Sequence, residues 1–179
     1  MAISNTNTGW INDDTMRVKF AQDELVKGTA GEFNMLSSTH VTEFELTPAM
    51  VNLGTSDTAP YVLDFDTVFP NGSVINKIEL IGTTTTWDSA GDAGAVNMGL
   101  VKRSDFATIV DADGLINSLA DDAIVAGDVI EITVGSTGAG ALLGTALEFD
   151  SVICVYVETE NITAGTEIKV RLHWRTPAI

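Results

Sequence analysis

The stretch "EIKVRLHWR", residues 167–175, alternates without a break between apolar and polar side chains. Successive side chains of a β-strand point to opposite faces, so this pattern predicts a strand with one face toward a core and one toward solvent. The core face holds Ile168, Val170, Leu172 and Trp174, and the solvent face holds Lys169, Arg171, His173 and Arg175.

The same alternation recurs along most of the chain after residue 40, between turns rich in Gly, Asp, Asn and Pro. Further candidate strands occupy residues 40–47, 61–68, 73–82, 94–102, 128–134, 144–149 and 151–158. In the third of these we expect Val74, Ile78 and Leu80 to share the core face. The continuous apolar run at 152–157 suits a central strand covered on both sides. About eight short strands predict an all-β fold, either a β-sandwich or a jelly roll.

Two segments depart from this pattern. Apolar residues recur at helical spacing in residues 114–128, with Asp113 placed to cap the start and Gly127 to end it, which predicts one short helix or helical turn in a crossover between sheets. The first 40 residues fit a strand or a helix equally well. We therefore divide the chain into an N-terminal arm or extension, residues 1–40, and a β-sandwich domain, residues 41–179. The arm packs either on a neighbouring molecule or back on its own sandwich.

The composition bounds the possible functions. The chain has 179 residues, 45% of them hydrophobic, which suits one ordinary domain with a core. Nine Lys and Arg against 25 Asp and Glu give a formal net charge of -16, which argues against a nucleic-acid partner. Neither a membrane span nor a signal peptide is visible, so we expect synthesis in the cytoplasm and no membrane partner. The one cysteine, Cys154, lies among apolar residues as a structural thiol would.

Residues of the types used in catalysis form no catalytic pattern. His40 and His173 have no partners at a recognisable spacing. The glycine-rich segment 135–144 lacks the Lys-Ser/Thr ending of a phosphate-binding loop. Asp64 and Asp66 share one face of a strand, where two acids are far commoner as solvent-facing residues than as a glycosidase pair. We therefore predict no enzymatic activity and no cofactor.

A weak metal pattern lies in "DADGLIN", residues 111–117, where Asp111, Asp113 and Asn117 offer oxygen ligands. An EF-hand loop needs oxygen ligands at positions 1, 3, 5 and 12, with glycine at position 6. Here glycine stands at position 4 and leucine at position 5, so an Asp-rich turn with a helix cap is the preferred interpretation and calcium the alternative.

The candidate contact residues are basic or aromatic. Lys169, Arg171 and Arg175 form a stripe on one face of one strand, which either pairs with acids on a neighbouring strand or contacts an acidic partner surface. Trp10 and Trp87 are the aromatic candidates. Trp87 either covers the sandwich as a lid or stands exposed as an anchor.

The middle of the chain, roughly residues 60–120, resembles a group of tailed-bacteriophage virion proteins, in particular capsid decoration (cement) proteins and minor structural proteins. The resemblance rests on "FPNGSV" (69–74), "WDSAGDAG" (87–94) and "DGLI" (113–116), with the strands between them. It implies a β-sandwich or jelly roll without catalytic residues, in which Asp88 and Asp92 serve turns between strands.

The same resemblance implies a protein on the outer surface of a virion. Such a protein bridges neighbouring copies of the major capsid protein and is often a trimer. Two other functions stay open: a head-fibre, tail or spike module that binds host glycans, and a tail-tube or head-completion protein. An exposed aromatic platform favours the glycan module, and ring formation favours the tube protein.

Overall fold

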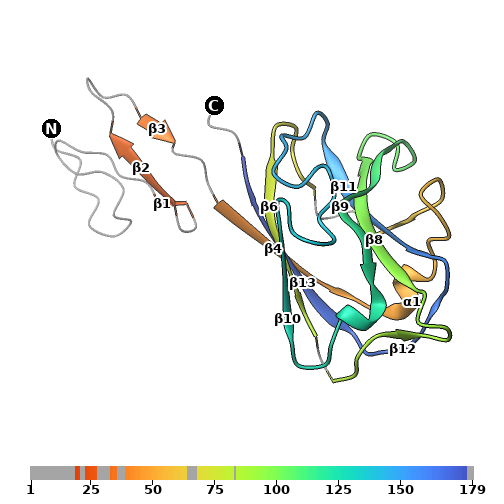
Figure 1. Cartoon of the computed structure of the whole chain (residues 1–179). Helices are drawn as coiled ribbons and strands as arrows, with labels where there is room; N and C mark the ends of the chain where they lie inside the picture. Colours follow the sequence, from red (N-terminus) through yellow and green to blue (C-terminus); the bar gives the residue numbers. More distant parts are fainter. Residues whose placement is uncertain are drawn as a thin grey trace, which may run out of the picture.

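The computed structural model describes residues 19–20, 23–27, 33–35, 39–63, 68–82 and 84–176, with side chains from residue 40 onward. Two four-stranded antiparallel sheets form a β-sandwich (Figure 1), so the predicted all-β fold is confirmed. The first sheet has the order β10-β6-β13-β4, with β4 at Thr39–Leu46, β6 at Val74–Ile81, β10 at Val129–Thr133 and β13 at Ile168–Arg175. The second has the order β5-β11-β8-β9, with β5 at Tyr61–Val62, β8 at Ala95–Lys102, β9 at Ile109–Ala120 and β11 at Ser151–Glu158.

Smaller elements complete the described part of the chain. β7 (Asp88–Ser89) pairs with β12 (Ile162–Ala164), and neither strand was predicted. The α-helix α1 (Pro48–Val51) begins after Thr47, whose side chain accepts a hydrogen bond from the Met50 backbone N–H. A separate three-stranded sheet of β1 (Lys19–Phe20), β2 (Asp23–Lys27) and β3 (Phe33–Met35) precedes β4. In the described residues, no helix has the length and apolar character to cross a membrane.

The main core lies between the two sheets. β6 and β13 of the first sheet contribute Ile75, Ile78, Leu80, Val170 and Leu172, and β8 and β11 of the second contribute Met98, Leu100, Ile153 and Val155. β11 is buried on its other face as well, where Val152 and Cys154 pack with Val101 in a second, smaller cluster. The expectation of a central strand covered on both sides is therefore confirmed.

The predicted core face of β6 needs one correction. Ile75 is fully buried, whereas Val74 is half-buried and Asn76 is exposed. The pairing with β13 shifts between His173 and Trp174, so His173 lies opposite Lys77 while Trp174 lies opposite Ile75. This bulge leaves Asn76 out of the ladder and reverses the alternation before it, which a strict period of two does not anticipate.

Of the short helix or helical turn predicted over residues 114–128, the structure holds only a helical turn. Residues 114–120 continue β9, and a single 3-10 turn follows at Asp121–Ala123. Three shifts in the β8–β9 register bring Leu115, Ile116 and Leu119 to buried positions at a spacing that imitates a helix. Asp113 therefore lies within a strand and caps nothing.

The predicted strand at residues 144–149 is also wrong, because its only ladder contact is an isolated bridge between Ala146 and Val74. The preceding residues cover the free edge of β9 instead. The backbone N–H of Asn117 donates to the Gly138 carbonyl, and the Gly140 N–H donates to the Leu115 carbonyl. The glycine-rich segment is thus an edge cover, and a Cβ at Gly140 would collide with the backbone of Gly114.

Candidate interaction surfaces

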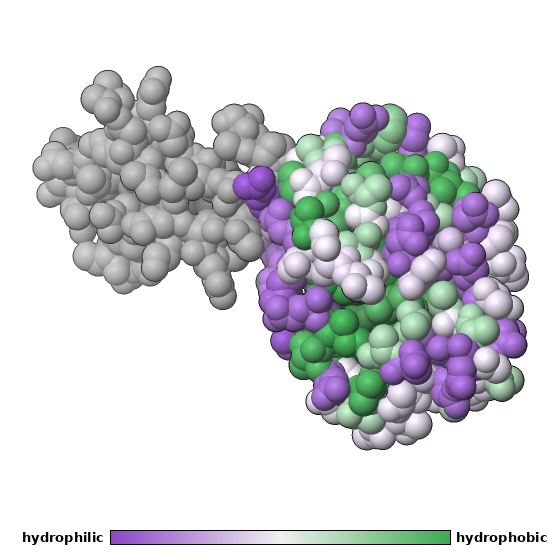
Figure 2. All heavy atoms as spheres, viewed as in Figure 1, coloured by the Kyte–Doolittle hydropathy of each residue, from purple (hydrophilic) through white to green (hydrophobic). Residues whose placement is uncertain are grey.

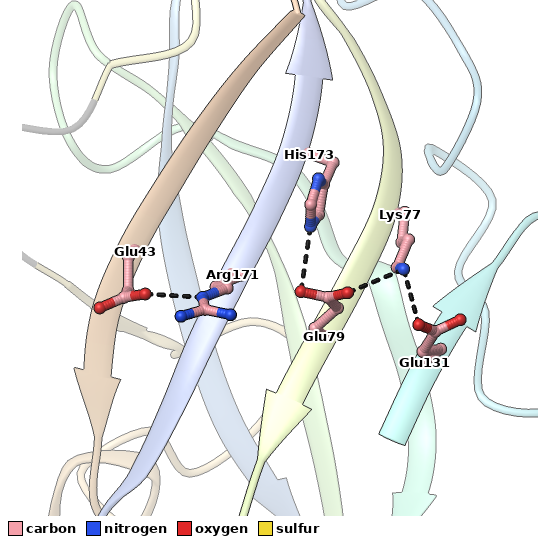
Figure 3. Close-up of polar contacts among 6 residues, drawn as sticks. All are labelled: Glu43, Lys77, Glu79, Glu131, Arg171 and His173. Carbon is pink, nitrogen blue, oxygen red and sulfur yellow. Dashed lines mark hydrogen bonds and ion pairs between the residues drawn. The ribbon is translucent and has the colours of Figure 1, made fainter. Parts of the chain in front are cut away.

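A ladder of charged side chains crosses the outer face of the first sheet (Figure 3). Glu43 on β4 accepts a hydrogen bond from Arg171 Nε at 2.7 Å and lies 3.0 Å from Lys169 Nζ. On β6, Lys77 Nζ lies 2.7 Å from both Glu79 and Glu131. Glu79 also pairs with His173 Nε2 at 3.1 Å. The strand register decides these pairs, since Arg171 lies between Glu43 on one side and Glu79 on the other.

The ladder largely neutralises itself. Hydrogen bonds from Arg171 and Lys169 lower the pKa of Glu43, and those from Lys77 and His173 lower the pKa of Glu79. Glu43, Lys169 and Arg171 are about two-fifths exposed, and ion pairs at such exposure contribute little to stability.

Of the three basic residues expected to contact a partner, Lys169 and Arg171 are engaged within the chain, as the neighbouring-strand alternative expects. Arg175 is exposed, and among the described residues no carboxylate lies within 4.0 Å of it. Arg175 therefore differs from Lys169 and Arg171, whose charges are paired within the chain.

The tryptophans differ in burial and in their contacts. Trp87 is fully buried, and its indole Nε1 donates to the Thr166 carbonyl at 2.7 Å, so the lid alternative fits and the exposed anchor does not. Trp174 is half-buried, stacked on His40 with ring centroids 4.4 Å apart and set edge-on to Phe69. Trp10 lies outside the described residues.

The loop after Trp87 has the contacts of a turn. Ser89 Oγ accepts hydrogen bonds from the backbone N–H groups of Ala93 and Gly94, at 3.1 and 2.9 Å. Asp92 occupies a left-handed conformation with φ 53°, as Asp commonly does in turns. Burial and the neighbouring Asp92 raise the pKa of Asp88. Asp92 therefore lies in a turn, as the resemblance implies, whereas Asp88 lies in the short strand β7 that precedes the turn.

No catalytic set assembles among the described residues. Cys154 is buried, and desolvation raises its pKa to about 12, so its thiol stays protonated and unreactive. Among the described residues, the side-chain partner of His173 is Glu79 of the charged ladder. Asp64 and Asp66 lie outside the described residues. Within the described part of the chain, no group of three or more His, Cys, Asp or Glu could hold a metal ion.

The three residues of the weak calcium pattern lie on β9, in a strand rather than in a calcium loop. Asn117 Nδ2 donates to Asp113 Oδ2 at 2.9 Å. Burial and the hydrogen bond with Asp113 raise the pKa of Asp111 to about 6. These contacts bring the carboxyl groups of Asp111 and Asp113 side by side.

An acidic hollow of about 440 Å3 opens beside this strand. It is lined by Thr55, Ser56, Asp57, Asp113, Asn117, Ser118, Tyr156, Glu158 and Thr159. Three of these residues are acidic and none is basic. Burial and the surrounding carboxylates, Asp113 first and Glu158 next, raise the pKa of Tyr156 to about 12. The negative charge of this hollow is therefore uncompensated within its lining.

A second hollow, of about 450 Å3, was not anticipated from the sequence. Its lining is Asn71, Lys102, Arg103, Ser104, Glu148, Phe149 and Asp150, drawn from three loops. Asp150 joins the loops, since its carbonyl accepts from the Arg103 N–H and its carboxylate accepts from the Asn71 N–H. Lys102 Nζ lies 3.6 Å above the Phe149 ring. Only the Lys-Arg pair before the turn signalled this site in the sequence.

The described residues form an all-β sandwich with a ladder of charged side chains (Figure 3) and two hollows at its surface. No family model matches the chain, and no curated protein matches it. Among solved structures, the chain is similar to one in the capsid of Ralstonia phage GP4, with a TM-score of 0.47 and 16% identity over 78% of this chain and 85% of that one. It is also similar to a chain in an acidic stable capsid structure of Helicobacter pylori bacteriophage KHP30, with a TM-score of 0.42 and 12% identity over 80% of this chain and 94% of that one.

Proposed function

We propose that this chain is a structural protein of a tailed-bacteriophage virion that binds the outside of the capsid and bridges neighbouring capsid subunits. The observation that carries the proposal is the resemblance of residues 60–120 to phage decoration and minor virion proteins. In the fold, this stretch supplies β6 to the first sheet and β5, β8 and β9 to the second. The resemblance therefore extends over strands of both layers.

The surfaces of the sandwich support a binding function rather than turnover. Polar groups on the first sheet neutralise one another, and the cysteine is buried. Decoration needs only many modest contacts repeated by symmetry, because linked contacts add through avidity. The partners are the major capsid protein and other copies of this chain, with a trimer favoured, and the protein acts on the capsid surface without catalysis.

The test is sedimentation of the purified protein with shells assembled from the major capsid protein encoded beside it. We expect saturable binding at a fixed ratio to capsid subunits. Arg175→Glu should weaken binding, because Arg175 is exposed and no carboxylate of the described residues pairs with it, while Arg171→Gln should change binding little. Absence of the wild-type protein from the shell pellet at every concentration would reject the proposal.

The alternative of a host-glycan module depends on exposed aromatic rings. Trp87 is buried and Trp174 is held between His40 and Phe69, so neither offers an open platform. Specific retention on a glycan array would revive this alternative. A ring much larger than a trimer would instead favour the tail-tube or head-completion alternative.

A further inference from the structure

Three surface loops form a hollow of about 450 Å3 at the end of the second sheet where β11 begins. Its lining comes from the turn before β6 (Asn71), from the end of β8 and the following turn (residues 102–104), and from the segment before β11 (residues 148–150). Sites for small ligands commonly enclose about 300 to 1,000 Å3, so this hollow is large enough for one.

The loops around this hollow are joined by hydrogen bonds of their backbones. The Gly72 N–H donates to the Leu147 carbonyl at 2.7 Å. Asp150 connects all three loops, because its carboxylate accepts a hydrogen bond from the Asn71 N–H at 2.8 Å and its carbonyl accepts one from the Arg103 N–H at 2.9 Å. The walls are therefore fixed before a ligand arrives, which reduces the entropy lost on binding.

The charges that line the hollow balance one another. Its basic residues are Lys102 and Arg103, and its acidic residues are Glu148 and Asp150. The nearby Asp105 does not line the hollow, and its carboxylate accepts hydrogen bonds from the backbone of its own turn. A ligand with a net charge therefore gains little from this lining.

Most polar side chains of the lining are free to bond a ligand. Among the described residues, the side chains of Asn71, Arg103, Ser104 and Glu148 form no hydrogen bond or ion pair. In the same part of the chain, neither basic side chain of the lining lies within 4.0 Å of the Glu148 or Asp150 carboxylate. The hollow thus presents unpaired donors and unpaired acceptors together.

The same hollow contains an aromatic ring. Phe149 is 39% exposed, and Lys102 Nζ lies 3.6 Å from the centre of its ring. The face of an aromatic ring carries partial negative charge, which attracts positively polarised groups such as this ammonium. The C–H bonds of a sugar ring are polarised in the same sense by the neighbouring oxygens. The exposed part of the Phe149 ring therefore suits the apolar face of a sugar.

A neutral ligand rich in hydroxyl groups fits this combination best. Each hydroxyl both donates and accepts hydrogen bonds, so one ligand can accept from Asn71 and Arg103 while it donates to Glu148. The net charge of -16 on the chain opposes an anionic ligand, and Lys102 with Arg103 opposes a cationic one. A wholly apolar ligand would leave these donors and acceptors without partners.

We propose that this hollow binds a neutral saccharide. One sugar ring lies on the exposed part of Phe149, and its hydroxyl groups accept hydrogen bonds from Asn71 and Arg103 and donate to Glu148. Glycans of bacterial surfaces and of animal cells both offer this chemistry. The site is distinct from Arg175, whose substitution tests capsid binding, and it does not depend on that function.

The first experiment screens the labelled full-length protein on an array of neutral and acidic glycans from bacterial surfaces and from animal cells. We expect retention on neutral glycans, and the origin of the retained glycans identifies the source of the ligand. Retention should persist in high salt, because a neutral ligand has no charge for salt to screen. Retention on acidic glycans alone, retention that salt abolishes, or no retention on any glycan would overturn the proposal.

Titration calorimetry with a retained glycan then locates the site. Phe149→Ser and Arg103→Ala should each raise the Kd about ten-fold or more, because one removes the stacking surface and the other a charged hydrogen-bond donor. Glu148→Gln keeps the shape of the side chain but replaces an acceptor oxygen with a donor nitrogen, so it should weaken binding as well.

Two exposed residues outside the lining provide matched controls. Phe106 is as exposed as Phe149, at 39%, and Arg175 is exposed like Arg103. Phe106→Ser and Arg175→Ala should leave the Kd unchanged. Melting curves check the fold of each variant, and Glu148→Gln at its exposed position keeps the test decisive if Phe149→Ser does not fold.

Unchanged affinity in all three hollow variants, or an equal loss of affinity in the controls, would overturn the site. Glycan binding without shell binding would overturn only the capsid function, whereas shell binding without glycan binding would overturn this site alone.

Discussion

The outer faces of the two sheets differ: that of the second sheet is apolar and buried along β11, and that of the first sheet is charged and partly exposed along β13. On the second sheet, the outward side chains of β11 include Val152 and Cys154, which are fully buried in a cluster of their own. On the first sheet, the outward side chains of β13 are Lys169, Arg171 and His173, which remain partly exposed and paired with glutamates. Figure 2 shows hydrophilic and hydrophobic residues interspersed over the visible side of the sandwich. The contrast separates an outer face that adds buried apolar contacts to the fold from an outer face whose charged side chains pair with one another at the surface.

The largest effects should come from placing a charged residue on the buried outer face and an apolar residue on the exposed outer face. Val152→Asp would place an unpaired carboxylate where no water reaches, at a cost of about 4 kcal/mol or more. Arg171→Val places an apolar residue on the open face and should leave the unfolding free energy close to wild type. Denaturant unfolding measures both, and equal losses would show that the two faces do not differ.

A smaller effect is expected at Gly99 in the middle of β8. A Cβ there would collide with the backbone of Asp111 and Ala112 on β9, so Gly99→Ala should cost about 3 kcal/mol through overpacking. Asn76→Ala is the control, since Asn76 is the exposed bulge residue of the first sheet. A thermal melt compares them, and a Gly99→Ala protein as stable as the control would contradict the close approach of β8 and β9.

Asp111→Asn should stabilise the protein at neutral pH. Because burial and Asp113 raise the pKa of Asp111 to about 6, its ionised form is disfavoured in the fold. A raised carboxyl pKa makes the folded state most favourable below the unfolded value of 3.8 and less favourable as pH rises through 6. With allowance for partial exposure, the variant should gain on the order of 1 kcal/mol at neutral pH.

The same change should have little effect at low pH, where wild-type Asp111 is already neutral. Unfolding curves for both proteins on either side of the window from 3.8 to 6 provide the measurement. A gain of equal size at both ends of that window would mean that the cost of ionising Asp111, through its burial and the neighbouring Asp113, is not the cause.

The smallest effect is expected at Glu43→Gln on the open face. Hydrogen bonds from Arg171 and Lys169 lower the pKa of Glu43, so its contribution is present above 4.5 and is lost as pH falls below it. Since Glu43 is exposed, the change at neutral pH should be close to the error of a melting curve and should vanish in high salt. Glu45→Gln, an exposed change on the same strand, is the control. A large loss for Glu43→Gln alone would show that the ladder is a stabilising network.

The alternation in residues 167–175 and the apolar run at 152–157 determined a great deal without the structure. Both depend only on local sequence, because the pleat of a strand assigns each residue to a face. They predicted the sandwich, the charged face of β13 and the doubly buried β11. The cysteine among apolar neighbours likewise predicted a buried thiol.

Tertiary structure alone decided the features that depend on register and on contacts between distant segments. Bulges moved Ile75 into the core and gave β9 a helix-like spacing, because one extra residue reverses every face that precedes or follows it. Pairing of β4 with β13 assigned Lys169 and Arg171 to Glu43, which sequence spacing could not do. Three loops far apart in the chain form the hollow that is lined by Lys102 and Arg103. Packing of the core buries Trp87, so this residue is a buried lid and not an exposed anchor.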